Sequence, residues 1–404
     1  MNCLSQHNSM DQLKLFNFKN SSIFFNSDTI LGLPILSNHN IHFLTKKNLN
    51  EFCYFDNNNL VIDFSEYIEK GNNFSFKFFS ENDLLFFGFP KSKSYYSFGF
   101  KYFSYFNLDI SNESLSLVWN GNNQYLDDVT YFENNTASLI QYSSLFFQYS
   151  SKISENFHFG TRISVLHGVN FFSLARGNFS LQTLSNSETP FGTFIETDMF
   201  FESSRASAFG FSNPGLSLNL GLQYDLNKWK FLIDIQNFGF ILWNKRNSQH
   251  QSDDYYFFDG VDYTMDEIFS EEINSTIDTL GNIFAIDRVS NKSFFSRLPL
   301  RINLRSSYSY NSSTDFFIDY YTMEHNISSY THYVFFGASK LFKKHTAIKM
   351  AYNFNNYSFT NIQFGLSKKF KNLLIDINTN NLLSIIDPRG FNYFNIQAGI
   401  YYFF

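Results

Sequence analysis

The sequence lacks a run of apolar residues long enough for a transmembrane helix. No stretch of its 404 residues approaches the roughly 18 consecutive apolar residues that such a helix requires. If the chain lies in a membrane, closed strands are the remaining solution, because every backbone polar group there needs a partner within the protein.

Charged residues and cysteines are also scarce. Only 16% of the residues are charged, whereas soluble domains average about 25%. The net charge of −6 argues against a nucleic-acid partner.

The two cysteines, Cys3 and Cys53, are too few for a disulfide-stapled scaffold. Cys3 is either a lipid-anchored N-terminus or an incidental cysteine. No lipobox or signal peptide precedes it, so we expect a cleaved export signal upstream of this sequence.

Aromatic and small polar residues are plentiful instead. The chain has 55 Phe and 25 Tyr, and aromatic residues make up 21% of it. Its mean hydropathy is nevertheless −0.23, because Asn and Ser are abundant. This combination is typical of a sheet that is apolar on one side and polar on the other, as in a membrane barrel.

The main structural signal is alternation with a period of two. From Leu216 to Asp225, apolar residues alternate with polar ones, and Trp229–Gln236 repeats the pattern after a short turn. A short hairpin therefore joins two strands here. The same alternation recurs at 298–305, 347–354 and 394–404.

These runs are about 8 to 11 residues long, close to the span of a tilted membrane strand. The sequence therefore predicts an all-β fold, a transmembrane antiparallel β-barrel of about 14–16 strands, with an outer-membrane location. A soluble β-sandwich, the alternative, predicts strands nearer five residues long. Further strands are expected at 73–80, 83–90, 94–109, 136–150, 155–167, 173–184, 192–202, 313–323, 330–341, 357–369 and 371–378.

Three regions interrupt the alternation. Residues 1–60 are irregular and are expected to plug the lumen or cap its mouth, while residues 61–404 form the barrel. Residues 60–70 suit a short helix. A long insertion at about 240–295 contains an amphipathic pattern at 261–280, which predicts one extramembrane helix.

Four segments carry a resemblance to a known family. They are Gly32–Pro34 with Leu36–Asn38, the stretch from Gly215 through Trp229 to Phe240 and Trp243, Phe258–Asp262, and Asn380–Leu383 with Pro388. In these segments the chain resembles a family of Bacteroidota outer-membrane barrels catalogued as a domain of unknown function. That family is similar in outline to fatty-acid-transporter-like barrels that assist type IX secretion.

The resemblance implies a fold and a compartment, and it brings no catalytic residue. The end of the chain also resembles the C-terminal signal that the barrel-assembly machinery reads in such barrels. Its residues are Phe404, Tyr402 and Ile400, which share one face of the last strand. That machinery and outer-membrane lipid are therefore expected partners.

A search for catalytic chemistry gives little. The sequence contains no His-Glu-x-x-His, Gly-x-Ser-x-Gly or Walker-type motif. Ser164, His158 and Glu324 would make a Ser-His-acid set only if the fold assembled them. We therefore expect no enzyme, no cofactor and no metal centre. One acidic loop offers oxygen ligands of the kind that calcium takes, without the spacing of a calcium loop, at Asp253, Asp254, Asp259 and Asp262.

Charged residues on the polar faces of the strands form the main candidate site. An Arg or Lys facing lipid at the bilayer midplane costs about 2–4 kcal/mol, so these residues should point into the lumen. They either select a solute or form ion pairs that brace a filled barrel. Arg301 and Arg305 should find acidic partners across neighbouring strands. The set is Arg162, Asp234, Arg301, Arg305, Asp319, Lys349 and Asp376.

Two functional hypotheses of different classes follow. In the first, the protein is a channel or transporter for a small or hydrophobic solute. In the second, it is a non-transporting barrel that binds a protein partner in a secretion or cell-surface assembly. A continuous lumen would favour the first and a filled lumen the second.

Overall fold

The computed structural model describes residues 28–56, 59–186, 189–207, 210, 212–258, 287–290, 292–326, 329–342 and 345–404. Strands account for 72% of these described residues. Among the described residues, no helix is both long and apolar enough to cross a bilayer.

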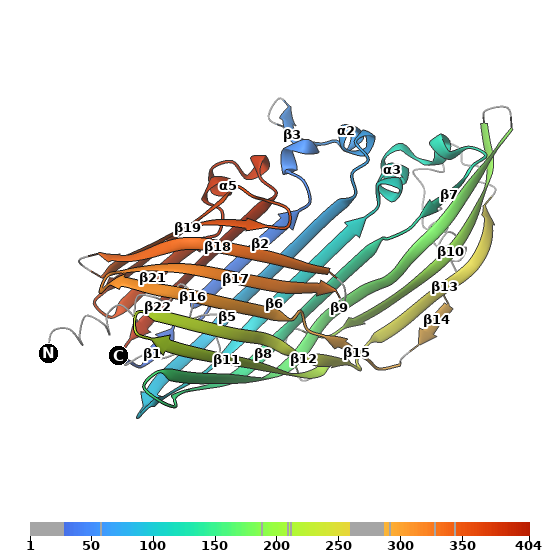
Figure 1. The fold of residues 1–404 in the computed structure, drawn as a ribbon. Coiled ribbons are helices and arrows are strands. Elements are labelled where there is room, and N and C mark those ends of the chain that lie inside the picture. Colours follow the sequence, from blue (N-terminus) through green and yellow to red (C-terminus); the bar gives the residue numbers. More distant parts are fainter. Residues whose placement is uncertain are drawn as a thin grey trace.

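The strands form one closed antiparallel barrel with 14 wall positions in the described part of the chain (Figure 1). Consecutive strands pair as neighbours, which confirms the predicted barrel and its strand number. The wall is built from β1 (Ile30–Gly32), β2 (Asn38–Thr45), β5 (Phe74–Lys91), β6 (Ser94–Ile110), β8 (Thr136–Lys152), β9 (Phe157–Asn186), β11 (Pro214–Leu226), β12 (Trp229–Trp243), β16 (Arg301–Asn311), β17 (Thr314–Asn326), β18 (Ser329–Phe342), β19 (Thr346–Asn355), β20 (Asn361–Phe370), β21 (Leu373–Thr379) and β22 (Tyr393–Phe403).

Strands β1 and β2 share one wall position and close the barrel. Both lie between β22 and β5 and pair with each of them. Within the segment expected to plug the lumen, strands β1 and β2 therefore belong to the wall, whereas the described residues after β2 form η2 (Leu49–Glu51), β3 (Cys53–Asp56) and the start of β4 (Asn59–Ile62) outside it. The sequence hid β1 and β2 because they are short and separated by a bend at Leu33–Ser37, where Ile35 takes a φ of 65°.

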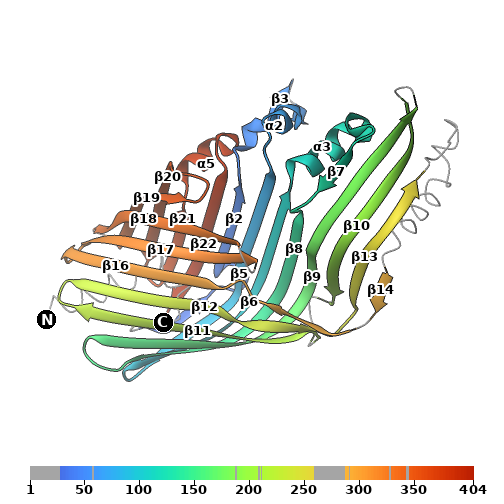
Figure 2. The same ribbon diagram turned by 45° about the vertical axis from the view of Figure 1, so that its right-hand side comes forward.

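The wall is much taller on one side than on the other (Figure 2). The lower half of β9 pairs with β11, whereas its upper half continues beyond the barrel and pairs with β10 (Thr189–Arg205). Three more strands widen this extension: β7 (Val129–Phe132), β13 (Asn247–Phe258) and β14 (Asp287–Ser290). We call the side formed by β6, β8, β9 and β10 the tall wall.

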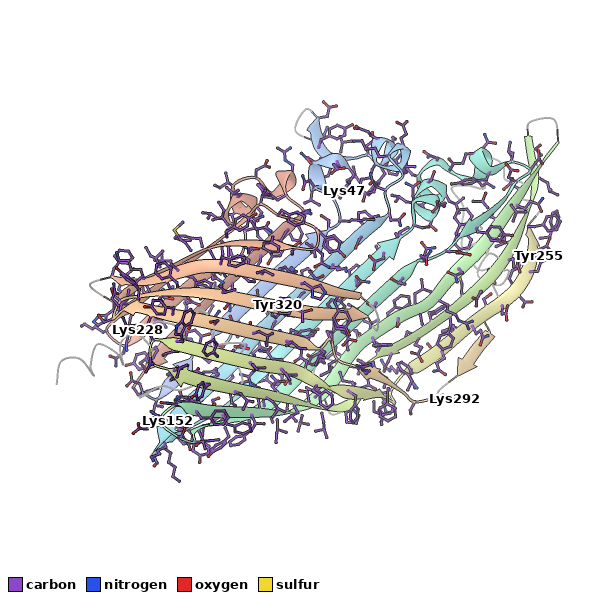
Figure 3. All side chains as sticks on the ribbon, in the orientation of Figure 1. Lys47, Lys152, Lys228, Tyr255, Lys292 and Tyr320 are labelled. Atoms are coloured by element: carbon purple, nitrogen blue, oxygen red, sulfur yellow. The ribbon has the colours of Figure 1, made fainter. Side chains whose placement is uncertain are left out.

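Connections differ at the two ends of the barrel. The end that contains the C-terminus has short turns, such as Leu226–Trp229, where Asn227 has the left-handed φ of 54° that Asn tolerates. Lys152 and Lys228 lie at this end, and Tyr255 and Lys292 at the other (Figure 3). The opposite end, the loop end, carries η2 (Leu49–Glu51), β3 (Cys53–Asp56), β4 (Asn59–Ile62), α2 (Ser65–Glu69), α3 (Asn112–Asn120), η3 (Asn122–Tyr125), β15 (Phe294–Arg297), α5 (Leu382–Ile386) and η4 (Pro388–Gly390).

Helix α2 lies within the range expected to form a short helix, residues 60–70, and begins after strand β4. The amphipathic helix predicted at 261–280 lies outside the described residues.

Side chains sort between the two faces of the wall as the alternation predicts. On β11, Leu216, Leu220 and Leu222 are exposed on the outer face, whereas Ser217 and Asn219 are buried on the inner face. In a membrane, the exposed leucines would contact lipid chains. On this strand the face toward the lumen is therefore polar and buried.

Gly168 marks the point at which β9 changes partner from β11 to β10. A Cβ atom there would lie 2.5 Å from the ring of the fully buried Trp243, so only glycine lets the ring pack against the strand. We expect Gly168→Val to lower the free energy of unfolding by roughly 1–3 kcal/mol through overpacking and to red-shift tryptophan emission. Gly210→Val is the control, because its nearest neighbours lie at ordinary contact distance. Equal stability of the two variants would contradict the packing described here.

Candidate functional site

The middle of the lumen contains a network of buried charges. Glu81 on β5 accepts from Lys101 Nζ at 2.7 Å and from Arg301 Nη1 at 2.8 Å. Lys101 also lies 3.0 Å from Asp83. Since Arg301 is on β16, this carboxylate joins opposite sides of the barrel. We call Glu81, Asp83, Lys101 and Arg301 the central ion network.

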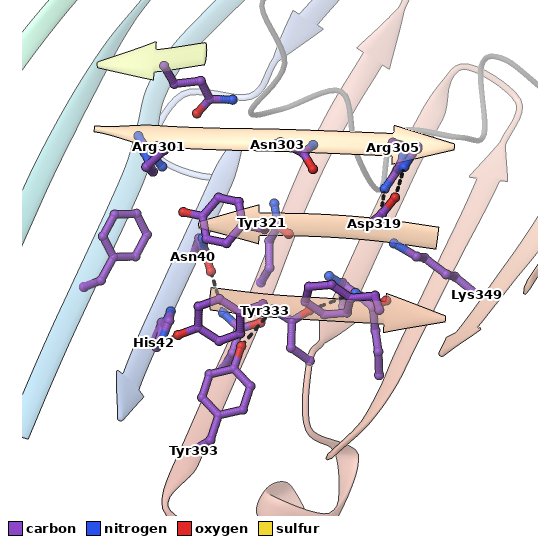
Figure 4. Close-up of a pocket in the computed structure, with 18 residues that line it drawn as sticks. Asn40, His42, Arg301, Asn303, Arg305, Asp319, Tyr321, Tyr333, Lys349 and Tyr393 are labelled. Carbon is purple, nitrogen blue, oxygen red and sulfur yellow. Dashed lines mark hydrogen bonds and ion pairs between the residues drawn. The ribbon is translucent and has the colours of Figure 1, made fainter. Parts of the chain in front are cut away.

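A second group of charges lies beside this network, around a cavity of about 130 Å³ (Figure 4). Arg305 donates to Asp319 through two nitrogen atoms, and the two residues are direct partners on neighbouring strands. Lys349 lies with its Nζ 4.6 Å from the centre of the Phe317 ring. Tyr333 and His42 close the cavity toward the loop end, and the hydroxyl oxygen of Tyr333 lies 3.1 Å from Nε2 of His42.

The remaining predicted lumen residues are also buried and bonded. Arg162 donates to Gln148 Oε1 at 2.9 and 2.6 Å and stacks over the Phe146 ring. Asp234 accepts from Gln236, and Asp376 accepts from Ser367 Oγ at 2.7 Å. All seven residues predicted to face the lumen therefore lie inside the barrel with polar or aromatic neighbours.

Apolar side chains close the lumen on both sides of the charges. Toward the short-turn end, Tyr95, Tyr401 and Phe403 pack with Ile30 and Leu374. Toward the loop end, a larger cluster, the aromatic layer, spans the barrel. It consists of Phe79, Phe103, Tyr105, Ile140, Tyr142, Leu166, Ile241, Trp243, Phe294, Leu298 and Met323. Membrane barrels of eight strands are filled by their own side chains, and those of 16 to 18 strands leave a channel. In this barrel of 14 wall positions, the two apolar clusters and the charges between them occupy the lumen.

The sequence analysis did not identify Glu81 and Asp83 as members of the lumen site. Because the segment Ser80–Asp83 is polar, the alternation predicts two strands there, 73–80 and 83–90. The segment is instead the middle of one strand, β5. Alternation along β5 could have revealed these residues, because Lys77, Glu81 and Asp83 lie on the same face of the strand as Phe79. Arg305 has its acidic partner on the neighbouring strand, whereas the partner of Arg301 comes from across the lumen.

A larger cavity of about 490 Å³ lies at the loop end of the lumen. It is bounded by the inner face of the tall wall and by the opposite rim, formed by residues 295–299 and Glu324. Tyr105, Ile140 and Leu298 of the aromatic layer line it, so the cavity sits directly on the closed part of the lumen. We call this cavity the vestibule.

Comparison with known families identifies the chain at the level of a family. The model of a family of unknown function, DUF5723, matches residues 24–377, well over half of the sequence. The chain belongs to the DUF5723 family. This confirms membership of a family without an assigned function. The Bacteroidota origin and the connection with type IX secretion stay predictions.

Solved structures similar to this DUF5723 member are also barrels. A Pseudomonas aeruginosa FadL homologue shares 12% identity, with 94% of this chain and 91% of that chain covered and a TM-score of 0.46. The Pseudomonas putida toluene transporter TodX shares 8% identity, with coverage of 94% and 90% and a TM-score of 0.43. No curated protein matches the sequence.

The acidic residues considered as a cation site do not form a loop in this DUF5723 member. Asp253 and Asp254 are consecutive residues of β13, so their side chains point to opposite faces of the strand and cannot bind one ion together. Asp259 and Asp262 lie outside the described residues. No cluster of three or more His, Cys, Asp or Glu side chains suited to a metal occurs in the described ranges.

The Ser-His-acid set considered above is not assembled. Ser164 and His158 lie on one strand, six residues and therefore roughly 20 Å apart. His158 lies 3.3 Å from Asp225 at the short-turn end, whereas Glu324 is at the loop end.

The three residues of the expected assembly signal lie together on the outer face of the last strand. Ile400, Tyr402 and Phe404 alternate with buried inward residues, and the rings of Tyr402 and Phe404 touch edge to face. Phe404 follows β22 and donates its N–H to the carbonyl of Thr29 at 3.0 Å.

Proposed function

We propose that the protein is an outer-membrane barrel that takes up a small, partly apolar solute at its loop end and passes it through a lumen that opens during transport. The vestibule is the observation that carries this proposal. Its volume of about 490 Å³ falls in the range of small-molecule sites, and its floor is the aromatic layer that closes the lumen. Transport would then require movement of lumen side chains and not of the hydrogen-bonded wall. No enzymatic activity is part of the proposal.

Removing one ion pair across the lumen tests this function. Glu81→Ala with Arg301→Ala deletes both partners of the 2.8 Å pair, so neither is left as a buried lone charge. We expect steady ionic conductance in planar bilayers to be low for the natural protein and to rise in the double variant. The control is Glu66→Ala with Lys70→Ala, an exposed pair on α2.

Solute uptake is measured separately, in vesicles with a lipopolysaccharide outer leaflet. The protein should speed uptake of N-phenyl-1-naphthylamine, an apolar dye that this leaflet excludes, while ionic conductance stays low. Steady conductance of the natural protein would contradict a closed lumen. Absence of dye uptake, together with a silent double variant, would overturn the transport proposal.

The second candidate is a partner barrel without transport. It is supported by the extension of the tall wall, which exposes large aromatic side chains beyond the barrel, among them Tyr131, Tyr255 and Phe257. A protein of a secretion or surface assembly would bind there. In either case, we propose that outer-membrane lipid surrounds the apolar exterior and that the assembly machinery reads the outer face ending at Phe404.

A further inference from the structure

The tall wall presents an aromatic row to the vestibule. Tyr105 on β6 lies opposite Ile140 on β8, and Ile140 lies opposite Phe171 on β9. All three side chains line the cavity. Neighbouring strands lie roughly 4.8 Å apart, so this row is a continuous apolar surface about two strand spacings wide. It suits the flat body of a small aromatic or aliphatic solute.

A polar row runs parallel to it, two residues further along the same strands. Asn107 pairs with Ser138, Ser138 with Ser173, and Ser173 with Glu202 on β10. All four residues line the vestibule. Two residues along a strand correspond to roughly 6.6 Å, so a solute whose body rests on the aromatic row would place a nearby polar group on this second row.

Three polar atoms of the vestibule lining are buried without a hydrogen-bond partner. They are Oδ1 of Asn107, Oγ of Ser138 and Oε2 of Glu324. Two of them belong to direct cross-strand partners, and the third comes from the opposite rim. Buried polar atoms are nearly always satisfied in native proteins, so three around one cavity call for a ligand, an ion or water. All three can accept a hydrogen bond.

Glu324 gives the site its charge preference. The residue is only 6% exposed, and no cation of the described residues forms an ion pair with it. The second carboxylate, Glu202, accepts from Gln249 at 2.7 Å. Arg297, an exposed residue of β15, also lines the vestibule, so the charged residues of the lining are two carboxylates and one guanidinium. A buried carboxylate without a cationic partner is costly, and a positively charged ligand would remove that cost.

We propose that the vestibule binds a protonated primary amine attached to a compact apolar body. The ammonium group would donate to Glu324 and to the polar row, since it has only N–H donors and the three atoms without partners are all acceptors. The body would lie on the aromatic row, where Tyr105 and Phe171 also offer ring faces to the cation. This inference names the class of solute and rests on the proposed function.

Direct binding to the full chain in detergent tests the proposal. The probes are phenethylamine, which is protonated at neutral pH, and phenethyl alcohol, its uncharged analogue, measured by isothermal titration calorimetry. We expect the amine to bind at least about tenfold more tightly than the alcohol. We also expect Glu324→Gln to weaken amine binding at least about tenfold and to leave alcohol binding unchanged.

Two further variants and a stability measurement complete the test. Glu113→Gln removes an exposed carboxylate from α3, outside the vestibule, and should not change amine binding. Glutamine keeps the shape of Glu324 and removes an unpaired charge. The midpoint temperature of thermal unfolding of Glu324→Gln without ligand should therefore equal or exceed that of the natural protein. Phenethylamine should raise that midpoint in the natural protein and not in Glu324→Gln. Arg297→Gln should tighten amine binding.

The outcomes separate this inference from the transport proposal. Equal binding of amine and alcohol, or equal amine binding by Glu324→Gln and the natural protein, would overturn the amine site. Binding that depends on Glu324, in a protein that passes no solute in vesicles, would overturn transport and leave the ligand class standing. Solute uptake that is equal for charged and uncharged solutes, and unchanged in Glu324→Gln, would overturn the amine site and leave the transport proposal standing.

Discussion

Replacing Glu81 with glutamine should strongly destabilise the barrel. Glu81 is the carboxylate between Lys101 and Arg301, and all three side chains are buried. Glutamine is nearly isosteric but uncharged, so Arg301 would lose its ion pair in the interior, while Lys101 would keep Asp83. Breaking a buried ion pair in this way costs about 3–5 kcal/mol. Urea unfolding in lipid vesicles, followed by tryptophan emission, measures the change.

A matched control and a rescue sharpen this prediction. Glu66→Gln makes the same chemical change in an exposed pair with Lys70 and should leave the unfolding midpoint unchanged. Adding Arg301→Gln to Glu81→Gln removes the isolated charge and should restore part of the lost stability. If Glu81→Gln and Glu66→Gln unfolded at the same urea concentration, the network would not be a stabilising contact.

Arginine in place of Leu220 should prevent stable insertion into a membrane. Leu220 lies at the middle of β11, 40% exposed on the outer face, opposite Ile235 of the next strand. A guanidinium facing lipid at the bilayer midplane costs about 2–4 kcal/mol, which is a large share of the stability of a folded protein. Folding into vesicles, followed by the shift of the band on unheated gels, should fall sharply.

The control for this substitution is an exposed apolar residue outside the barrel wall. Val118 on α3 is 81% exposed at the loop end, so Val118→Arg should fold as the natural protein does. Asn219, the neighbour of Leu220, is unsuitable as a control, because it is packed inside the lumen opposite Arg162 on β9. Equal folding yields for the Leu220 and Val118 variants would reverse the assignment of the lipid face.

Period-two alternation made the wall predictable where one face is apolar and the other polar. Strand β11 shows why, because its leucines face outward and its Ser, Asn and Gln residues inward. The same alternation predicts that the charged residues point into the lumen. It does not predict which residues pair across the lumen, since Glu81 and Arg301 are 220 residues apart and meet only when the barrel closes.

The sequence was less informative where strands lack that contrast. Strand β13 is rich in Gln, Ser and Asp, so its region was assigned to a long insertion, yet it pairs along its whole length with β10. Backbone hydrogen bonds to a neighbour stabilise such a strand without an apolar face. The vestibule was equally hidden, because its polar row takes one residue from each of several strands.

The single wall position shared by β1 and β2 has a consequence for the order of folding. Ile30 pairs with Phe403 on one side and with Gly88 on the other, so the beginning and end of the described chain meet at one seam. Contacts between residues so far apart in sequence form slowly, because closing a long loop is entropically costly. The hairpins from β5 to β21 can zip up from local contacts. The ring should therefore remain an open, curved sheet until the seam forms, and a slow last kinetic phase should report its closure.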